Sequence, residues 1–265
     1  MITNKNLPHA IFLDVDGTLI TPPKNVDLHS GQLHERNIKA IKKAQALGHK
    51  VLINSGRGFS GMPFSFFDKD VTFDGFVTAL GTSVIVDGVT VLDKPIDEKT
   101  LSEVVDYMIE NKKNCRFQGD KSCIAILYDQ KYSDMWTVVS TKEEFFSALE
   151  GKIYKITVSG GLTEDCCDFL KERFNMYFYG NRAAEGASFG TDKAFGMMVA
   201  LGFLGIPPER SIAMGDSIND VEVLKAAGTS VAMGNASDEI KALCDMVTLN
   251  DADGGVGAAI EKLLL

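Results

Sequence analysis

Two aspartates separated by one residue, Asp14 and Asp16, follow a short apolar run over residues 9–13 and precede Gly17. Phosphoryl transfer to an enzyme carboxylate needs a nucleophile and, close to it, a group that protonates the leaving oxygen. We therefore predict that Asp14 attacks phosphorus. Asp16 would be the general acid, and then the base for the water that hydrolyses the acyl phosphate. The glycine would let the backbone turn and bring N–H groups to the phosphate. The same string also occurs at surface strand ends with an Asp-Gly turn, so it needs support from elsewhere in the chain.

A second acidic group begins at Asp216, which ends another apolar segment, and continues to Asn219 and Asp220. Mg²⁺ prefers oxygen ligands, usually one or two carboxylates completed by water and phosphate oxygens. We predict a Mg²⁺ site made by Asp14, the backbone carbonyl of Asp16, and Asp216. Asn219 and Asp220 would hold the water shell of the metal or orient its ligands. Asp220 also fits a helix N-cap, and both roles can hold together.

Two further segments supply groups suited to a phosphate. Ser55 follows the second apolar strand, and its hydroxyl would donate to phosphate oxygens together with the N–H groups of Gly56 and Arg57. Lys193 begins a predicted helix and would place a cation against the phosphate and the nucleophilic carboxylate. Considered alone, such residues are more often ordinary turns or solvated side chains. Their order between the two acidic groups makes them candidates.

The elements that position these residues alternate between strands and helices at both ends of the chain. Short apolar runs predict buried strands, and apolar residues at helical spacing predict helices. We expect strands at 9–13, 50–54, 76–80, 211–215, 229–233 and 246–249, and helices at 34–47, 193–204, 220–227, 238–244 and 256–264. Buried strands joined by helices form a parallel sheet. We predict an α/β fold with a doubly wound, Rossmann-like core that binds its ligand outside the carboxyl ends of the strands.

The middle of the chain has a different pattern. Residues 84–91 have the signature of a hairpin with Asp-Gly at the turn. Helices at 101–112 and 163–174 and strands at 122–127, 152–159 and 176–179 follow. Such a mixture suggests an inserted α+β unit with an antiparallel sheet. We expect a discontinuous core over residues 1–84 and 186–265 and a cap domain over residues 85–185.

Composition and charge argue against several classes of protein. The chain has 265 residues, 45% hydrophobic and 24% charged, which is ordinary for a globular protein. A formal net charge of −9 gives no basic footprint for nucleic acid, and no apolar run is long enough to span a membrane. The N-terminus lacks the apolar stretch of a secretory signal, and five cysteines without a CxxC favour reduced thiols. We expect a cytoplasmic monomer or homodimer that binds neither nucleic acid nor membrane.

Together these segments resemble the motifs of the haloacid dehalogenase (HAD) superfamily. The resemblance is carried, in this order, by Asp14-Val15-Asp16-Gly17-Thr18, Ser55, Lys193 and Gly215-Asp216-Ser217-Ile218-Asn219-Asp220. The insertion is similar to the type IIB cap of the Cof-like subfamily, and Met233-Gly234-Asn235-Ala236 and Asp253-Gly254-Gly255-Val256 also look Cof-like. One departure is Leu80-Gly81-Thr82, where such proteins often carry Asn-Gly-Ala.

The resemblance implies a Mg²⁺-dependent phosphatase that acts on sugar phosphates or similar small phosphorylated metabolites. By the same analogy Asp14 is the nucleophile and Asp16 the acid and base. The implied metal ligands are Asp14, Asp16 and Asp216, and the implied phosphate or substrate ligands are Ser55, Lys193 and Asn219.

Residues that select the leaving group would come from the cap. The candidates are Arg116, Lys121, Trp136, Tyr179, Asn181 and Arg182, although surface or core placement is the default for each. Two other functions stay open. A phosphomutase would share the Asp nucleophile but return the phosphate to another hydroxyl, and a non-catalytic protein would only bind a phosphorylated metabolite.

Overall fold

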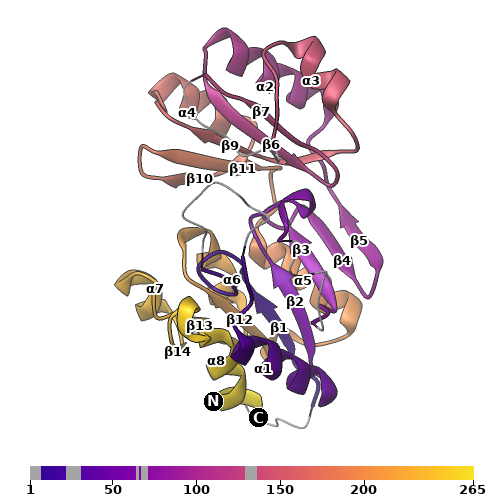
Figure 1. Cartoon of the computed structure of the whole chain (residues 1–265), viewed down its shortest axis with the longest axis vertical. Coiled ribbons are helices and arrows are strands. Elements are labelled where there is room, and N and C mark those ends of the chain that lie inside the picture. Colours follow the sequence, from indigo (N-terminus) through magenta and orange to yellow (C-terminus); the bar gives the residue numbers. More distant parts are fainter. Residues whose placement is uncertain (1–6, 22–30, 64–65, 67–70, 129–135) are drawn as a thin grey trace.

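The described residues form two β-sheets, which lie one above the other along the long axis of the molecule (Figure 1). The computed structural model describes residues 7–21, 31–63, 66, 71–128 and 136–265. The strands are β1 (Ala10–Leu13), β2 (Lys50–Asn54), β3 (Gly75–Thr78), β4 (Ser83–Val86), β5 (Val89–Asp93), β6 (Asn114–Gly119), β7 (Cys123–Ile126), β8 (Thr137–Val138), β9 (Ile153–Ser159), β10 (Asn175–Tyr179), β11 (Ala183–Ala187), β12 (Ser211–Gly215), β13 (Thr229–Ala232) and β14 (Met246–Val247). The helices are α1 (Glu35–Ala46), α2 (Glu98–Glu110), α3 (Lys142–Ala148), α4 (Glu164–Lys171), α5 (Lys193–Leu204), α6 (Val221–Ala226), α7 (Asp238–Leu243) and α8 (Gly255–Leu264), with short 3₁₀ turns η1 (Phe59–Gly61), η3 (Pro208–Arg210), η4 (Ile218–Asp220) and η5 (Asp251–Asp253).

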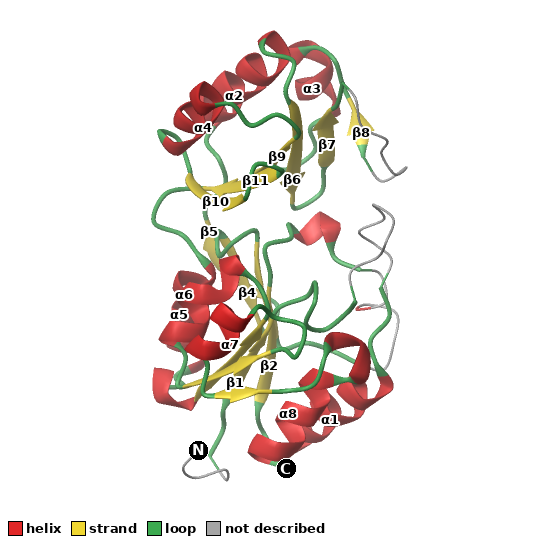
Figure 2. Ribbon diagram, turned by 90° about the vertical axis from the view of Figure 1, so that its left-hand side faces the viewer, coloured by secondary structure: helices red, strands yellow, loops and turns green. Residues whose placement is uncertain are grey.

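The larger sheet lies between two layers of helices (Figure 2). Its order is β14-β13-β12-β1-β2-β3-β4-β5, parallel from β14 to β3 and antiparallel beyond. Successive side chains of a strand point to opposite faces. In β1, Ile11 and Leu13 pack in the cluster with α1 and α8, whereas Ala10 and Phe12 pack with α5 and α6. This arrangement confirms the predicted α/β fold with a doubly wound core.

The register of the three central strands sets the position of the expected site. β1 pairs with both β12 and β2, so that Leu13 lies opposite Met214 on one side and Ile53 on the other. The residues that follow these positions therefore leave the sheet at the same edge. Asp14 follows directly, while Ser55 and Asp216 are each two residues beyond the paired positions.

The smaller sheet has the order β10-β11-β9-β6-β7-β8, and α2, α3 and α4 cover one of its faces (Figure 2). The alternation of β6 shows how its two faces differ. Cys115 and Phe117 are buried in the cluster with the helices. Arg116 and Gln118 belong to the opposite face and line a pocket between the two sheets.

The hairpin predicted at residues 84–91 forms, but it belongs to the larger sheet. β4 pairs with β3, and β5 extends the same sheet. The expected start of the insertion at residue 85 therefore falls inside a strand of the larger sheet, and β11 runs to Ala187, beyond the expected end at residue 185. The division into core and cap domains stays a prediction.

Apart from the short 3₁₀ turns, four described elements were not expected from the sequence: β6, β8, α3 and β11. In β6, apolar Cys115 and Phe117 alternate with polar residues, and this period-two pattern is a sequence-level signal of a strand. α3 begins with a capping box between Thr141 and Glu144, which is also a sequence-level signal. β11 consists mostly of alanine and glycine, which have little strand propensity, so its pairing with β9 and β10 is what makes it a strand. Within the described ranges, no helix is both long and apolar enough to cross a membrane.

Candidate active site

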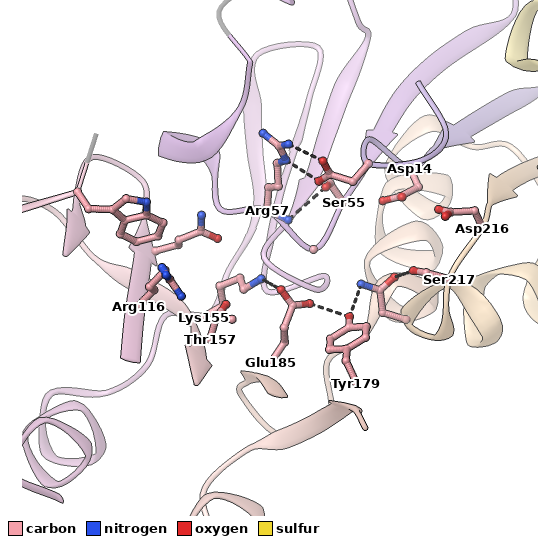
Figure 3. Close-up of a pocket in the computed structure, with 15 residues that line it drawn as sticks. Asp14, Ser55, Arg57, Arg116, Lys155, Thr157, Tyr179, Glu185, Asp216 and Ser217 are labelled. Atoms are coloured by element: carbon pink, nitrogen blue, oxygen red, sulfur yellow. Dashed lines mark hydrogen bonds and ion pairs between the residues drawn. The ribbon is translucent and has the colours of Figure 1, made fainter. Parts of the chain in front are cut away.

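One pocket lies where the carboxyl ends of β1, β2 and β12 face the smaller sheet (Figure 3). Its volume is about 490 Å³. It is lined by Asp14, Asp16, Ser55, Gly56, Arg57, Arg116, Gln118, Trp136, Lys155, Thr157, Tyr179, Glu185, Asp216, Ser217 and Asn219. The pocket thus brings together seven of the nine residues expected at the site. The other two, Lys193 and Asp220, are buried directly behind Asp14.

Lys193 joins two of the buried carboxylates. Its Nζ donates to Oδ1 of Asp14 and to Oδ1 of Asp220, each at 2.6 Å. Only 1% of the Lys193 side chain is exposed, so these contacts replace its hydration. Asn54, which the sequence analysis did not single out, donates from Nδ2 to the backbone oxygen of Lys193 at 3.0 Å. This hydrogen bond attaches the start of α5 to the end of β2 and so fixes the position of the Lys193 backbone.

Asp14, Asp216 and Asp220 form an acidic cluster, in which one carboxylate oxygen from each lies within 4.8 Å of the others. Burial raises the pKa of Asp14 well above its ordinary value, against the opposing charge of Lys193. Burial and then the charge of Asp220 raise the pKa of Asp216 to about 7. The pKa of Lys193 is raised despite its burial, because the two adjacent carboxylates favour its charged form. The three carboxyl groups share one lysine, so a further cation beside them would favour their charged forms.

The residues present fit a divalent cation. Asp216 Oδ1 is buried and has no hydrogen-bond partner among the described residues, although a buried carboxylate oxygen normally has one. Gly17 allows the loop after β1 to approach this carboxylate. Its φ is +76°, and a Cβ there would lie 2.4 Å from Oδ2 of Asp216. An oxygen-rich cluster with an unsatisfied carboxylate is the chemistry that Mg²⁺ prefers.

Asp220 organises the loop that carries Asp216. Its Oδ2 accepts from the backbone N–H groups of Asp216 and Ser217 at 3.1 and 3.0 Å. Ser217 is the N-cap of the helical turn η4, and Ser217 and Asp220 form a capping box. Asp220 occupies the expected N-cap position of α6, but its side chain makes no capping hydrogen bond to that helix and serves the preceding turn instead. With one oxygen on Lys193 and the other on the loop, Asp220 has the geometry of a residue that orients others.

The carboxylate of Asp16 lies outside this acidic cluster, in a bidentate ion pair with Arg57. Arg57 Nε and Nη2 donate to its two oxygens at 2.6 and 2.5 Å, and Nη1 donates to the backbone oxygen of Gly61 at 2.9 Å. The Arg57 side chain is 5% exposed and that of Asp16 is 40% exposed. Arg57, expected to contact phosphate, thus contacts the expected acid and base, and both line the pocket.

The turn after β2 contributes further polar groups. Ser55 is buried, and its Oγ accepts from the backbone N–H of Arg57 at 3.1 Å. Asn219 Oδ1 accepts from Ser217 Oγ at 3.0 Å, and its Nδ2 donates to Tyr179 Oη at 3.0 Å. Ser55 and Asn219, both expected to bind phosphate, therefore line the same pocket, and each is already fixed by at least one hydrogen bond.

The smaller sheet supplies the other wall. Of the cap candidates, Arg116, Trp136 and Tyr179 line the pocket. Lys121, Asn181 and Arg182 are not among its described lining residues, and Asn181 lines a separate cavity beside Phe178. Four further side chains of the smaller sheet line the pocket and were not predicted: Gln118, Lys155, Thr157 and Glu185. Polar residues alternate with buried apolar ones in β6 and β9, and this alternation could have identified three of the four.

The segment Leu80-Gly81-Thr82 keeps the glycine of the expected motif, and the structure shows why a glycine fits there. Ala79 and Leu80 both have positive φ, at 49° and 59°, which ends β3 earlier than predicted. A Cβ at Gly81 would lie 1.9 Å from the backbone oxygen of Asp192. The glycine therefore permits the close approach of the start of α5, which carries Lys193.

The sequence is similar to known proteins over nearly its whole length. The sequence model of the haloacid dehalogenase-like hydrolases matches residues 11–260. The putative phosphatase YkrA of Bacillus subtilis (strain 168) is 25% identical over 260 residues, covering 96% of each chain. The chloroplastic endoribonuclease YBEY of Arabidopsis thaliana is 26% identical over 274 residues, covering 95% of this chain and 46% of that protein, so the chain spans about half the length of this relative.

Solved structures share the fold. A haloacid dehalogenase-like hydrolase from Bacteroides thetaiotaomicron superposes with a TM-score of 0.80 at 22% identity, covering 97% of this chain and 99% of the other. The HAD subclass IIB sugar phosphatase BT4131 gives a TM-score of 0.77 at 22% identity, covering 96% of this chain and 98% of the other.

Proposed function

The chain belongs to the haloacid dehalogenase-like hydrolases, and on that premise we propose that it is a Mg²⁺-dependent phosphatase that hydrolyses small phosphate monoesters through an aspartyl-phosphate. The observation that carries the proposal is the position of Asp14. Its carboxylate lies at the carboxyl end of the central strand β1 and accepts a hydrogen bond from the buried Lys193. Beside it is Asp216, whose Oδ1 has no hydrogen-bond partner among the described residues. This is a suitable place for a carboxylate nucleophile to meet a phosphate.

In the first step an oxygen of Asp14 attacks phosphorus, and the bond from phosphorus to the leaving oxygen breaks. The hydrogen bond from Lys193 to Oδ1 orients the carboxylate and leaves Oδ2 to attack. Ser55, the backbone of Gly56 and the Asn219 carboxamide are placed around the pocket to bind the phosphate oxygens. Bound Mg²⁺ would be held by Asp14, Asp216 and the backbone carbonyl of Asp16, and would supply neutralisation of the phosphate charge beside these carboxylates.

Proton transfer falls to Asp16. We propose that it protonates the leaving oxygen in the first step and activates water in the second. Each of its oxygens accepts one hydrogen bond from Arg57 and keeps a second lone pair, through which a proton can be given or taken. Arg57 then keeps the carboxylate within the pocket between the two steps.

The unit built on the smaller sheet would act as a cap that selects the leaving group. Its pocket-lining side chains are mostly polar, with one indole from Trp136. A volume of about 490 Å³ suits a small phosphorylated metabolite such as a sugar phosphate. The name of BT4131 as a sugar phosphatase supports this class without fixing one substrate.

The test is release of inorganic phosphate from an aryl phosphate and from a panel of phosphorylated sugars, with Mg²⁺ and with a chelator. We expect turnover that requires Mg²⁺ and products that are alcohol and phosphate. Isomerised substrate without phosphate release would identify a phosphomutase instead. Binding of the same compounds without any turnover would identify a binding protein.

A further inference from the structure

A chain of hydrogen bonds runs from the smaller sheet to the loop that carries Asp216 (Figure 3). Lys155 Nζ donates to Oε1 of Glu185, and Tyr179 Oη donates to Oε2 of the same carboxylate at 2.9 Å. Asn219 Nδ2 donates to Tyr179 Oη at 3.0 Å, and Ser217 Oγ donates to Asn219 Oδ1 at 3.0 Å. The chain therefore links β9, β10 and β11 to a residue expected to bind phosphate.

The carboxylate of Glu185 fixes the direction of the two hydrogen bonds that meet at the Tyr179 hydroxyl. A carboxylate only accepts hydrogen bonds, so the single proton of the Tyr179 hydroxyl points toward Glu185. Burial and the charge of Glu185 raise the pKa of Tyr179, which keeps this proton in place. The Tyr179 oxygen is then an acceptor toward Asn219, and the NH₂ end of the Asn219 carboxamide must face it. The carbonyl end correspondingly faces the Ser217 hydroxyl.

The contact is close and lies at the phosphate side of the pocket. A Cβ at Gly56 would lie 3.2 Å from Asn219 Nδ2 and 3.4 Å from Glu185 Oε2. The side chains of Asn219 and Glu185 therefore both lie close to the backbone of Gly56, which follows Ser55. A carboxamide nitrogen carries two N–H bonds, of which one is used by Tyr179, so the other remains for a phosphate oxygen.

From this geometry we propose that Tyr179 is a positioning residue, which sets the orientation of the Asn219 carboxamide and so directs its second N–H toward the phosphate when the cap is docked. The inference rests on the proposed phosphatase function. Without the hydroxyl, the carboxamide can rotate and present its carbonyl oxygen to the phosphate, which is repulsive. Tyr179 would in this way influence the phosphate site through Asn219, without contacting the substrate.

The test is a double-mutant cycle with Tyr179→Phe, Asn219→Ala and the pair, using an aryl phosphate with Mg²⁺. Wild-type turnover checks the proposed function separately, and if it is absent the same cycle is measured on binding of inorganic phosphate. Tyr154→Phe is the matched control. Tyr154 Oη donates to Asp93 Oδ1 at 2.7 Å, which also joins the two sheets, but Tyr154 is not among the described residues that line the pocket.

We expect Tyr179→Phe to lower kcat/KM about tenfold and to weaken inhibition by inorganic phosphate by a similar factor, the loss of about one hydrogen bond. Tyr154→Phe should leave both values near wild type. In the Asn219→Ala background, Tyr179→Phe should have almost no further effect. Equal losses from Tyr179→Phe in both backgrounds, or the same loss from Tyr154→Phe, would show that the tyrosine only supports the cap and would overturn the proposal.

Discussion

Arg57 binds both carboxylate oxygens of Asp16, through Nε at 2.6 Å and Nη2 at 2.5 Å. The arginine is buried and the aspartate reaches the pocket, so the pair places the expected acid and base without burying it. A guanidinium makes such a planar, bidentate contact, and an ammonium group does not. Holding Asp16 in this way therefore requires an arginine at position 57.

We predict that Arg57→Lys lowers kcat about tenfold with a smaller change in KM, because the charge is kept and one oriented hydrogen bond is lost. Steady-state kinetics with an aryl phosphate measure this. Arg36→Lys is a suitable control, since Arg36 pairs with Glu261 on the surface. Wild-type kcat in Arg57→Lys would show that the bidentate pair does not position Asp16.

Removal of the buried lysine should destabilise the fold. Lys193→Met leaves Asp14 and Asp220 buried without their cation, and breaking such a pair typically costs about 3–5 kcal/mol. Because the pKa of Asp14 is already raised by burial, the variant can relieve the charge by protonation at low pH. The deficit in unfolding free energy should then be larger at about pH 8 than at about pH 5.5.

Urea unfolding at both pH values measures this deficit. Lys39→Met, which removes an exposed i,i+4 pair with Glu35, should change little. A Lys193→Met deficit that does not vary with pH would mean that the carboxylates stay charged or find other partners.

Mg²⁺ binding should weaken as the pH falls through about 7. The pKa of Asp216 is raised to about 7 by burial and by Asp220, so below that pH the cation must displace a proton. A carboxyl with a raised pKa stabilises the fold only at low pH and loses that contribution as the pH rises through the raised value. Added Mg²⁺ should therefore raise the melting temperature more at about pH 8 than at about pH 5.5. Equal Mg²⁺ shifts at both pH values would argue against Asp216 as a ligand.

A histidine pair at the opposite end of the sheet predicts a separate pH effect. The His9 backbone N–H donates to His49 Nδ1 at 3.1 Å, and burial lowers the pKa of both imidazoles from 6.5. A lowered pKa means that below 6.5 the unfolded chain takes up protons that the folded chain does not. Stability should fall as the pH decreases from 6.5 toward the lowered values.

Chemical denaturation across this range checks the effect. His49→Asn keeps an acceptor but removes one titrating group, so its stability should depend less on pH than that of the wild type. A variant with the same pH dependence as the wild type would exclude His49 as the cause.

The central strands and their chemistry could be predicted because they are buried on both faces. Their apolar runs located β2 and β12 at the observed residues and β1 within one residue. Parallel strands then bring Asp14, Ser55 and Asp216 to one edge whatever the details of the loops. Lys193 was identified through its place in the order of motifs, and the structure places it against Asp14.

The remaining relationships depend on contacts that a sequence pattern does not contain. The sequence indicated Arg57 as a phosphate ligand. Its ion pair with Asp16 depends on the conformations of the loops after β1 and β2, which a sequence pattern does not give. The link from Tyr179 to Asn219 needs the relative placement of two sheets. Lys155 and Glu185 lie on strands whose register is set by antiparallel pairing, so their contact follows only from the assembled sheet.

The measurement that bears most directly on the chemistry is the site of phosphorylation during turnover. The enzyme is mixed with a radiolabelled phosphate ester and Mg²⁺, quenched in acid and digested, and the labelled peptide is identified. We predict label on the peptide containing Asp14 in the wild type, and neither label nor turnover in Asp14→Asn, which should melt at a similar temperature. Label on a different residue, or near wild-type turnover by Asp14→Asn, would contradict the assignment of Asp14 as the nucleophile.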